Sequence, residues 1–317
     1  MDVKPRTLYR WYRFVISDFV KDNKTERFAG HTVYDVELET AEVKRDIVVH
    51  ILKKENVEEE MCIDEKMIGQ NYALIFSAYT TGKIALLVDT VKPAAISQAI
   101  ELLENDNLLK VKKINSDMSP TIMNVVKQTM PKAEIVIDKF HVMKHVVDAV
   151  NTERLEIKKE LKADRTIHRD NPNGWTDIEF VDKAKYWLIM KPEKLQVENY
   201  KYLKQLLDKY PKLKEAYTLI NELRVWYDKK NIGKPRFRLE QELERWMIKV
   251  EKATITAFIP IAKMIEKHQE EILGYFEKGL TNAKAENLNS RIQRFLMDSY
   301  GSRDRDFFFY RCQVYFA

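Results

Sequence analysis

The sequence predicts an α/β protein in which a mixed β-sheet with covering helices is interrupted by a large all-helical segment. Short apolar runs bounded by turn-like residues follow one another between residues 59 and 90. Helix and strand patterns then alternate up to about residue 140, and from about 142 to 280 only helical patterns occur. Short apolar runs are typical of strands, and their alternation with helices is typical of a sheet covered by helices.

Residues 1–57 are expected to form a helical N-terminal region. Apolar and aromatic residues recur at helical spacing over residues 3–20 and again over residues 40–54. The chain begins with charged and aromatic residues, and no apolar run follows them, so a signal peptide is not expected.

Three adjacent strands are expected after this region. They cover residues 59–66, 71–81 and 82–90, where short apolar runs are separated by turn-like residues. Gly82 follows two threonines and is expected in the hairpin turn between the second and third strands.

Helices and strands then alternate through the rest of the predicted sheet. A helix is expected to begin near Pro93, and the strand that follows it ends at Asp117. Ser119 is a candidate N-cap for the next helix, with Pro120 at its first position. A fifth strand, rich in isoleucine and valine, ends at Asp138.

The predicted organisation is therefore discontinuous in sequence. Residues 58–145 and 281–317 are expected to form one α/β core, and residues 146–280 an all-α insertion. The last helix of the core is expected to begin near Thr281 and to end at Gly301. Two tryptophans of the insertion, Trp226 and Trp246, are expected in its core.

Composition excludes several classes of protein. The chain has 317 residues and 45% hydrophobic content, which allows a sizeable core. Eight glycines leave no glycine-rich phosphate-binding loop, and no apolar run is long enough for a membrane helix. Cys62 and Cys312 are too few for a disulfide framework or a four-cysteine zinc site, so a reducing, cytoplasmic location is expected. The net charge of +5 is compatible with nucleic acid without indicating it.

Three acidic residues stand where a sheet could bring them together. Asp64 lies on the first expected core strand, Asp117 at the end of the fourth, and Glu286 on the last helix. Mg²⁺ prefers oxygen ligands and keeps part of its water shell, so a few converging carboxylates would hold it. Most acidic residues are nevertheless solvated caps or turns, and this interpretation stays open. Glu65 should point to the opposite face from Asp64 and is expected to support the site rather than bind an ion.

A second polar pair follows the fifth expected strand. Asp138 and His141 are three residues apart, just beyond an apolar run. Such a pair could bind a metal ion, orient a phosphate or pair internally, and the residues alone do not decide among these roles.

Several segments of the chain are similar to one family, the DDE transposases of bacterial insertion sequences of the ISL group. The segments that carry this resemblance are I-D-E at 63–65, S-D-M-S-P at 116–120, P-K-A-E-I-V-I-D-K-F-H-V-M-K at 131–144, L-K-E-A-Y at 213–217, E-R-W at 244–246, T-N-A-K-A-E-N-L-N at 281–289 and Y-G-S-R-D-R-D-F-F-F-Y-R at 300–311. The resemblance runs from about residue 60 to the end. D-x-F-H combined with the distant T-N-x-x-A-E-x-x-N is its most specific part.

The resemblance implies a ribonuclease-H-like catalytic core and a set of site residues. Asp64, Asp117 and Glu286 would be the catalytic carboxylates and would hold two Mg²⁺ or Mn²⁺ ions. Asp138 and His141 match the D-x-F-H element, which lies near the active site of the family.

Further residues match the family around these positions. Two asparagines flank the glutamate and would position it or contact DNA, and Ala283 stands where glycine is common. Four basic side chains are candidates for holding the phosphate backbone. The asparagines are Asn282 and Asn289, and the basic residues are Lys139, Lys144, Arg291 and Arg294.

The resemblance also implies partners and leaves rival functions. The expected reaction is metal-dependent hydrolysis at transposon ends followed by 3′-hydroxyl strand transfer into target DNA, by a homo-oligomer on DNA. Many relatives begin with a cysteine zinc module and a helix-turn-helix, which this chain lacks, so the resemblance implies a recognition module that is either shorter or encoded as a separate N-terminal protein. The alternatives are an inactive or regulatory DNA-binding derivative, and a ribonuclease-H-like nuclease without strand transfer.

Overall fold

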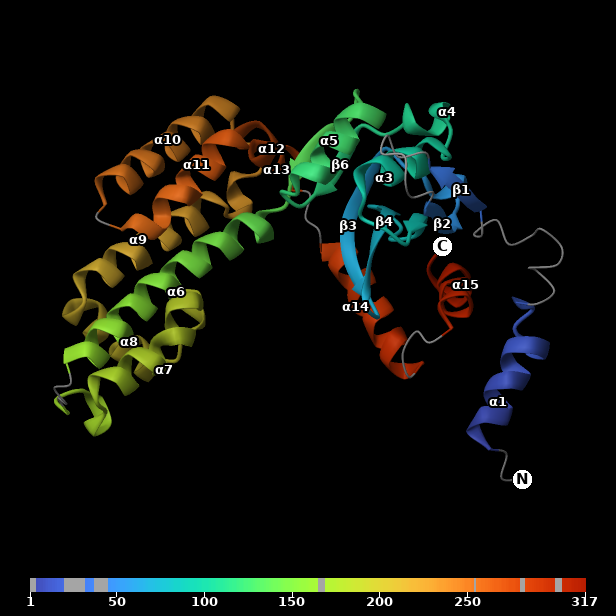
Figure 1. Ribbon diagram of the computed structural model, residues 1–317. Helices are drawn as coiled ribbons and strands as arrows, with labels where there is room; N and C mark the ends of the chain where they lie inside the picture. The colour runs from blue at the N-terminus through green and yellow to red at the C-terminus, as the bar shows by residue number, and fades with distance from the viewer. Residues whose placement is uncertain are drawn as a thin grey trace. The chain divides into compact units, whose positions relative to one another are not determined.

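A computed structural model describes residues 4–19, 32–36, 45–164, 169–253, 255–279, 283–299 and 304–317 (Figure 1). The chain divides into two compact units, which are described separately. One unit comprises residues 1–136 and 281–317, and the other residues 137–280. The prediction of an α/β protein with a mixed sheet is confirmed. None of the described helices is both long and apolar enough to cross a membrane.

The first unit is built on one seven-stranded sheet with the order β1-β2-β5-β4-β3-β6-β7. The strands are β1 (Thr32–Val36), β2 (Arg45–Leu52), β3 (Glu60–Ile68), β4 (Asn71–Ala78), β5 (Ile84–Val88), β6 (Lys113–Ser116) and β7 (Glu134–Ile137). The pairs β1–β2, β2–β5, β5–β4 and β4–β3 are antiparallel. The pair β3–β6 is parallel, so the sheet is mixed. The three core strands expected from the sequence correspond to β3, β4 and β5.

The prediction that residues 1–57 form a helical region is partly wrong. Residues 5–16 are helical, as α1 (Pro5–Trp11) and a π-helical turn (Tyr12–Ile16), but residues 45–52 form β2. This segment, RDIVVHIL, is rich in β-branched residues, whose side chains pack well on a pleated sheet. Val49 and Ile51 are fully buried against β5, so pairing with a distant strand overrides the local helical spacing.

Two of the helices between the strands begin where the sequence predicts, near Pro93 and at Pro120, whereas the short helix at Asn105–Leu108 was not predicted as a separate one. α3 (Pro93–Glu101), α4 (Asn105–Leu108) and α5 (Pro120–Thr129) connect β5 to β6 and β6 to β7. The hydroxyl of Ser119 accepts a hydrogen bond from the N–H of Ile122 and caps α5. Gly82 has a φ of +70° in the turn between β4 and β5, a conformation that glycine adopts without strain.

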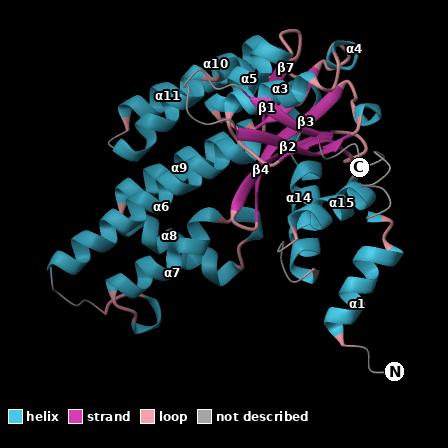
Figure 2. Cartoon of the chain, turned by 45° about the vertical axis from the view of Figure 1, so that its right-hand side comes forward, coloured by secondary structure: helices cyan, strands magenta, loops and turns pink. Residues whose placement is uncertain are grey.

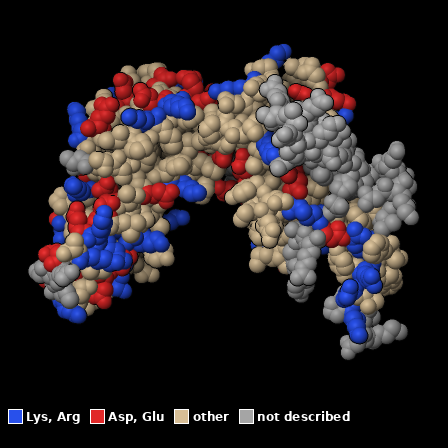
Figure 3. Space-filling model, viewed as in Figure 1, with Lys and Arg blue, Asp and Glu red and all other residues tan. Residues whose placement is uncertain are grey.

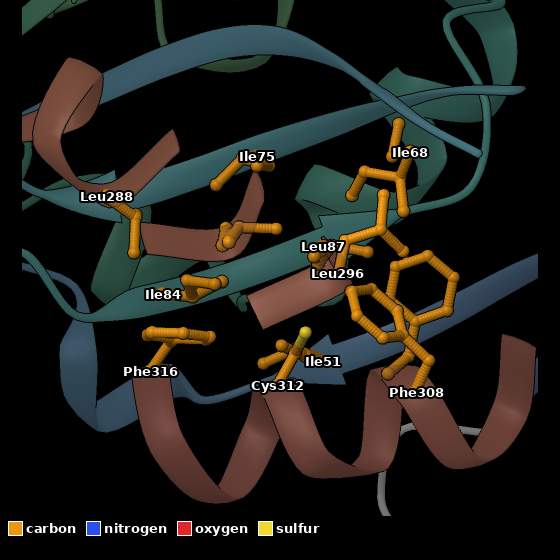
Figure 4. Close-up of a cluster of buried hydrophobic side chains, with 13 residues drawn as sticks. Ile51, Ile68, Ile75, Ile84, Leu87, Leu288, Leu296, Phe308, Cys312 and Phe316 are labelled. Atoms are coloured by element: carbon orange, nitrogen blue, oxygen red, sulfur yellow. The ribbon is translucent and has the colours of Figure 1, made fainter. Parts of the chain in front are cut away.

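Two C-terminal helices complete the first unit. α14 (Ala283–Asp298) and α15 (Arg305–Phe316) pack their apolar side chains on β2, β3, β4 and β5 (Figure 4). Leu288, Ile292 and Leu296 repeat every four residues, which gives α14 one buried face. The sheet therefore acquires this cover only from the last part of the chain.

A half-buried ion pair anchors the start of α15. Arg305 bonds both carboxylate oxygens of Asp89, just after β5, and also donates to the carbonyl of Ile68 at the end of β3. His50 of β2 lies 3.6 Å from the same carboxylate and stacks on the ring of Phe309. The cluster ties the last helix to three strands at once.

The described part of the second unit contains helices and turns only (Figure 2). Its helices are α6 (Lys139–Asp164), α7 (Asp177–Ile189), α8 (Val197–Lys209), α9 (Pro211–Trp226), α10 (Arg236–Lys252), α11 (Ile259–Lys267), α12 (Gln269–Leu273) and α13 (Tyr275–Lys278). Trp226 and Trp246 are buried, as expected, and their indole N–H groups donate to the carbonyls of Leu239 and Leu219. Each indole thus links α9 to α10.

Candidate active site

Asp64 lies on β3, and Asp117 directly follows the neighbouring strand β6. β3 and β6 run parallel, with Cys62 opposite Asn115 as the last pair of their register. Asp64 and Asp117 stand two residues beyond this pair on their two segments, and the charges of both act on the carboxyl of Glu65. Both residues are half-buried, so their carboxylates combine access to solvent with a fixed backbone.

Each of these two carboxylates is oriented by hydrogen bonds. Asp117 accepts a bond of 2.9 Å from the N–H of Ser119, which holds it over the start of α5. Asp64 Oδ1 accepts a bond of 2.9 Å from the N–H of Glu65, and Asp64 Oδ2 accepts a short bond from the side-chain amide of Asn289. Asn289 stands on α14, and the chain reaches this helix from β3 only after passing through the whole helical unit.

Glu286 lies one helical turn before Asn289 on α14. It is exposed, near the N-terminal end of the helix. Residues three apart on a helix share a face, so the bond between Asn289 and Asp64 brings this part of α14 to the strand. In the described part of the chain, no three His, Cys, Asp or Glu side chains are gathered so as to hold a metal ion unaided.

The donor set at this position nevertheless fits a divalent cation. Mg²⁺ is usually held by one or two carboxylates, with water and substrate phosphate oxygens completing its shell. Asp64 on β3 and Asp117 directly after β6 provide two carboxylates, and the charges of both act on Glu65. A preformed three-residue cage is therefore not required of such a site.

Glu65 takes a larger part in the electrostatics of the site than its sequence position indicates. Burial raises the pKa of its carboxyl, and the charges of Asp117 and Asp64 raise it further. Three carboxyl groups thus interact at the junction of β3 and β6. Strand alternation alone could not identify this, because it places Glu65 on the face opposite Asp64 and gives no information about Asp117.

Asn115 is a second residue that the sequence did not single out. It is 1% exposed, and neither its side-chain oxygen nor its nitrogen has a hydrogen-bond partner among the described residues. Unsatisfied buried amides are rare. Asn115 stands two residues before Asp117 on β6, in the immediate surroundings of the carboxylates.

Asp138 and His141 belong to the second unit, at the start of α6. Asp138 is 3% exposed, and its carboxylate accepts a hydrogen bond of 3.2 Å from the N–H of Phe140. Tyr227 is fully buried; burial raises the pKa of its hydroxyl, and the charge of Asp138 adds to this effect. His141 is half-buried beside the ring of Phe140.

The four candidate phosphate-binding side chains differ in their surroundings. Lys139 donates to the carbonyl of Tyr227 at 2.5 Å, and burial lowers the pKa of its ammonium group. It is therefore engaged within its own unit. Lys144, Arg291 and Arg294 are exposed, on a chain whose basic and acidic side chains are intermixed over the face shown in Figure 3. Asn282 lies outside the described residues.

Comparison with known proteins gives consistent matches. A protein-family model described as a transposase matches residues 61–312. The chain is 25% identical over 210 residues to the transposase for insertion sequence element IS1001 of Bordetella parapertussis, an alignment that covers 65% of this chain and 48% of that protein. It is 23% identical over 247 residues to the transposase for insertion sequence element IS1557 of Mycobacterium tuberculosis, covering 73% and 54%. The chain thus spans about half the length of these relatives. No solved structure matches it.

Proposed function

Because the chain belongs to the ISL3-type DDE transposases, we propose that it cuts phosphodiester bonds at transposon ends and joins the freed 3′-hydroxyl to target DNA. The proposal is supported by the parallel pairing of β3, which carries Asp64, with β6, which Asp117 directly follows, and by the bond that ties α14 to Asp64 through Asn289. Carboxylates on and beside two central strands, with a glutamate-bearing helix bonded to one of them, suit the chemistry that the family name implies.

The carboxylates of Asp64, Asp117 and Glu286 would hold two Mg²⁺ or Mn²⁺ ions. When bound, such ions activate the attacking oxygen and stabilise the leaving oxygen of an in-line displacement. In the first step a water oxygen forms a bond to phosphorus and the 3′-oxygen leaves as a hydroxyl. In the second step that hydroxyl forms the new bond to a target phosphorus, and a 3′-oxygen of the target leaves.

Asp138 and His141 would support this chemistry without holding the ions. Asp138 caps the start of α6 and faces Tyr227, which fits a structural role. His141, one turn further on, would orient a phosphate or a carboxylate. The proposed partners are the transposon ends, target DNA, a second copy of the chain and a separate recognition protein, in the cytoplasm.

A strand-transfer assay tests the proposal. Uncut transposon ends, which report cleavage, and pre-cleaved ends, which report joining, are each incubated with a target plasmid, the protein and Mg²⁺, with Asp64→Asn and Asp117→Asn as test variants. Both variants should lose cleavage and joining, whereas Asp106→Asn, an exposed change on α4, should retain them. Cleavage without joining would instead indicate a nuclease, and an inactive wild-type chain that still binds DNA would indicate a regulatory derivative.

A further inference from the structure

We infer that Asn289 is a positioning residue that fixes the Asp64 carboxylate and, through it, the distance between Asp64 and the helix that carries Glu286. The family resemblance implies a role toward the glutamate or toward DNA. The hydrogen bond instead runs from the Asn289 amide to Asp64 Oδ2, between residues 225 positions apart in the chain. This inference rests on the proposed function, since it concerns the same carboxylates.

The bond fixes the position of α14 relative to β3, because the Asp64 carboxylate and the helix are each held by further contacts. Asp64 Oδ1 is already held by the N–H of Glu65, so the amide of Asn289 fixes the remaining rotation of the carboxylate. On α14, Leu288 and Ile292 are buried on the sheet on either side of Asn289. A helix anchored on both sides of this bond presents Glu286, one turn earlier, at a set height over β3. Partners that orient a metal ligand typically contribute about 10–100-fold in metal affinity or activity.

The test measures metal binding directly as well as cleavage. Mn²⁺ affinity is measured by calorimetry on the protein without DNA, for wild type, Asn289→Ala and Asn289→Leu. The leucine variant keeps the branched shape of the side chain if alanine impairs folding. Asn287→Ala is the matched control, because Asn287 is an exposed asparagine on the same helix.

Both Asn289 variants should bind Mn²⁺ about 10–100-fold more weakly than wild type, and raising the Mg²⁺ concentration should partly restore their cleavage. Asn287→Ala should match wild type in both measurements. Equal Mn²⁺ affinity for wild type and the Asn289 variants would overturn the inference. Loss of Mn²⁺ affinity in a chain that never joins DNA would uphold it while contradicting the proposed function.

The helical unit carries a second, independent feature, a groove of about 740 Å³ between α9 and α10. Four basic and two acidic side chains line it, and each acid is paired to one lysine, Glu242 with Lys234 and Glu222 with Lys249. The remaining two cations, Lys230 and Arg245, are exposed and form no ion pair within the described residues. The floor is rigid, since the buried Trp226 and Trp246 span the two helices.

We propose that this groove holds the phosphate backbone of duplex DNA, the polyanion on which the proposed function acts. Residues 137–280 contain 29 Lys and Arg against 24 Asp and Glu, so the whole excess of +5 belongs to this unit. An adjoining groove of about 620 Å³ along the same helices adds Lys212, Lys214, Lys252 and the acidic Glu215, and Lys214 is paired with Asp208. An open cationic trough favours an extended polyanion over a small ligand.

The salt dependence of DNA binding separates this proposal from non-specific charge effects. Lys230→Glu with Arg245→Glu is compared with Lys201→Glu with Arg238→Glu, an equal change of charge at exposed positions of the same unit that do not line the groove. Anisotropy titrations of a labelled duplex, without metal ions, give the slope of log affinity against log salt. The groove variant should lose about 2 in slope, about 1 per phosphate contact, and the control much less. Equal losses would overturn the proposal, whether or not the protein cleaves DNA.

Discussion

At the scale of single residues, the site is a cluster of carboxyl groups held by short-range contacts. The sequence predicts that Asp64 lies on a strand and that Asp117 lies at the end of one, and the structure has Asp64 on β3 and Asp117 directly after β6. Glu65 and Asn115 were not predictable, because their importance depends on Asp117 approaching after β6, a strand that is separated from β3 by two other strands and two helices in the sequence. The hydrogen bond from Asn289 to Asp64 could not be predicted either, since helical periodicity indicates which face of the helix a residue lies on but not which residue it contacts.

Variants of Asp117, Asp138 and His141 distinguish the ligand from its supporting residues. Asp117→Ala should abolish cleavage, because it removes an oxygen donor beside Asp64. His141→Ala should slow cleavage about 10–100-fold, and Asp138→Ala should give a graded loss together with a lower melting temperature. Cleavage time courses at fixed Mg²⁺ give the comparison. If Asp138→Ala were inactive and Asp117→Ala active, the assignment of Asp117 as the second catalytic carboxylate would be wrong.

At the scale of helices and strands, an element was predicted correctly where local contacts determine it and incorrectly where a distant strand does. β3 to β7 and α5 were predicted because their apolar periods and the Ser119 cap are local signals. β2 was predicted as a helix because the spacing of its apolar residues fits the period of a helix as well as that of a strand. Its identity as a strand is decided by pairing with β5, which follows it only after β3 and β4. Such pairing cannot be read from one window of sequence.

The attachment of α14 to the sheet should depend on its buried face. Ile292 is fully buried, whereas Met297, on the same helix, is 69% exposed. Ile292→Ala should lower the free energy of unfolding by about 2–5 kcal/mol, because it leaves a cavity in the core. Met297→Ala should change it by less than about 0.5 kcal/mol. Equal losses in chemical denaturation would mean that α14 is not held by this face.

The cluster around Asp89 predicts a pH dependence. Burial raises the pKa of the Asp89 carboxyl, but the neighbouring His50 and the hydrogen bonds from Arg305 outweigh it, and the pKa lies below its ordinary value of 3.8. A lowered pKa means that the folded state favours the ionised form. The resulting stability is present above about pH 4 and is lost as the pH falls through the lowered pKa.

Asp89→Asn tests this dependence. At pH 7 it should reduce the free energy of unfolding by about 1.5–3 kcal/mol, the contribution of hydrogen bonds to charged groups. The difference from wild type should shrink as the pH falls below about 4. Denaturant titrations at several pH values, with Asp106→Asn as control, measure it. A difference that stays constant with pH would show that the Asp89 carboxylate is not the stabilising group.

At the scale of the whole molecule, charge and cysteine placement set expectations for DNA binding. Both cysteines are buried in the sheet unit, and burial raises the pKa of the Cys312 thiol. Neither is therefore available as a zinc ligand at the surface. Net charge rests in the helical unit, which is suited to sequence-independent contacts.

Footprinting of this chain alone on transposon ends should give weak protection that falls steeply with salt. Phosphate contacts release counterions, so affinity that rests on them declines strongly between about 50 and 200 mM salt. Adding the separate recognition protein should produce defined protection of the terminal repeat. Tight protection of one repeat by this chain alone at about 0.2 M salt would contradict the need for a partner.

The late return of α14 and α15 to the sheet has a consequence for synthesis on the ribosome. β5 ends at Val88, but Ile292, which covers the same apolar face, is made only after the whole helical unit. At about 5–20 residues per second, the face stays uncovered for roughly 10–40 s in every nascent chain. During that interval the exposed strands offer a surface to other chains, and a ribosome that stops before residue 283 releases a protein that cannot bury them. The yield of native protein should therefore depend on the speed of translation and on chaperones that hold nascent chains.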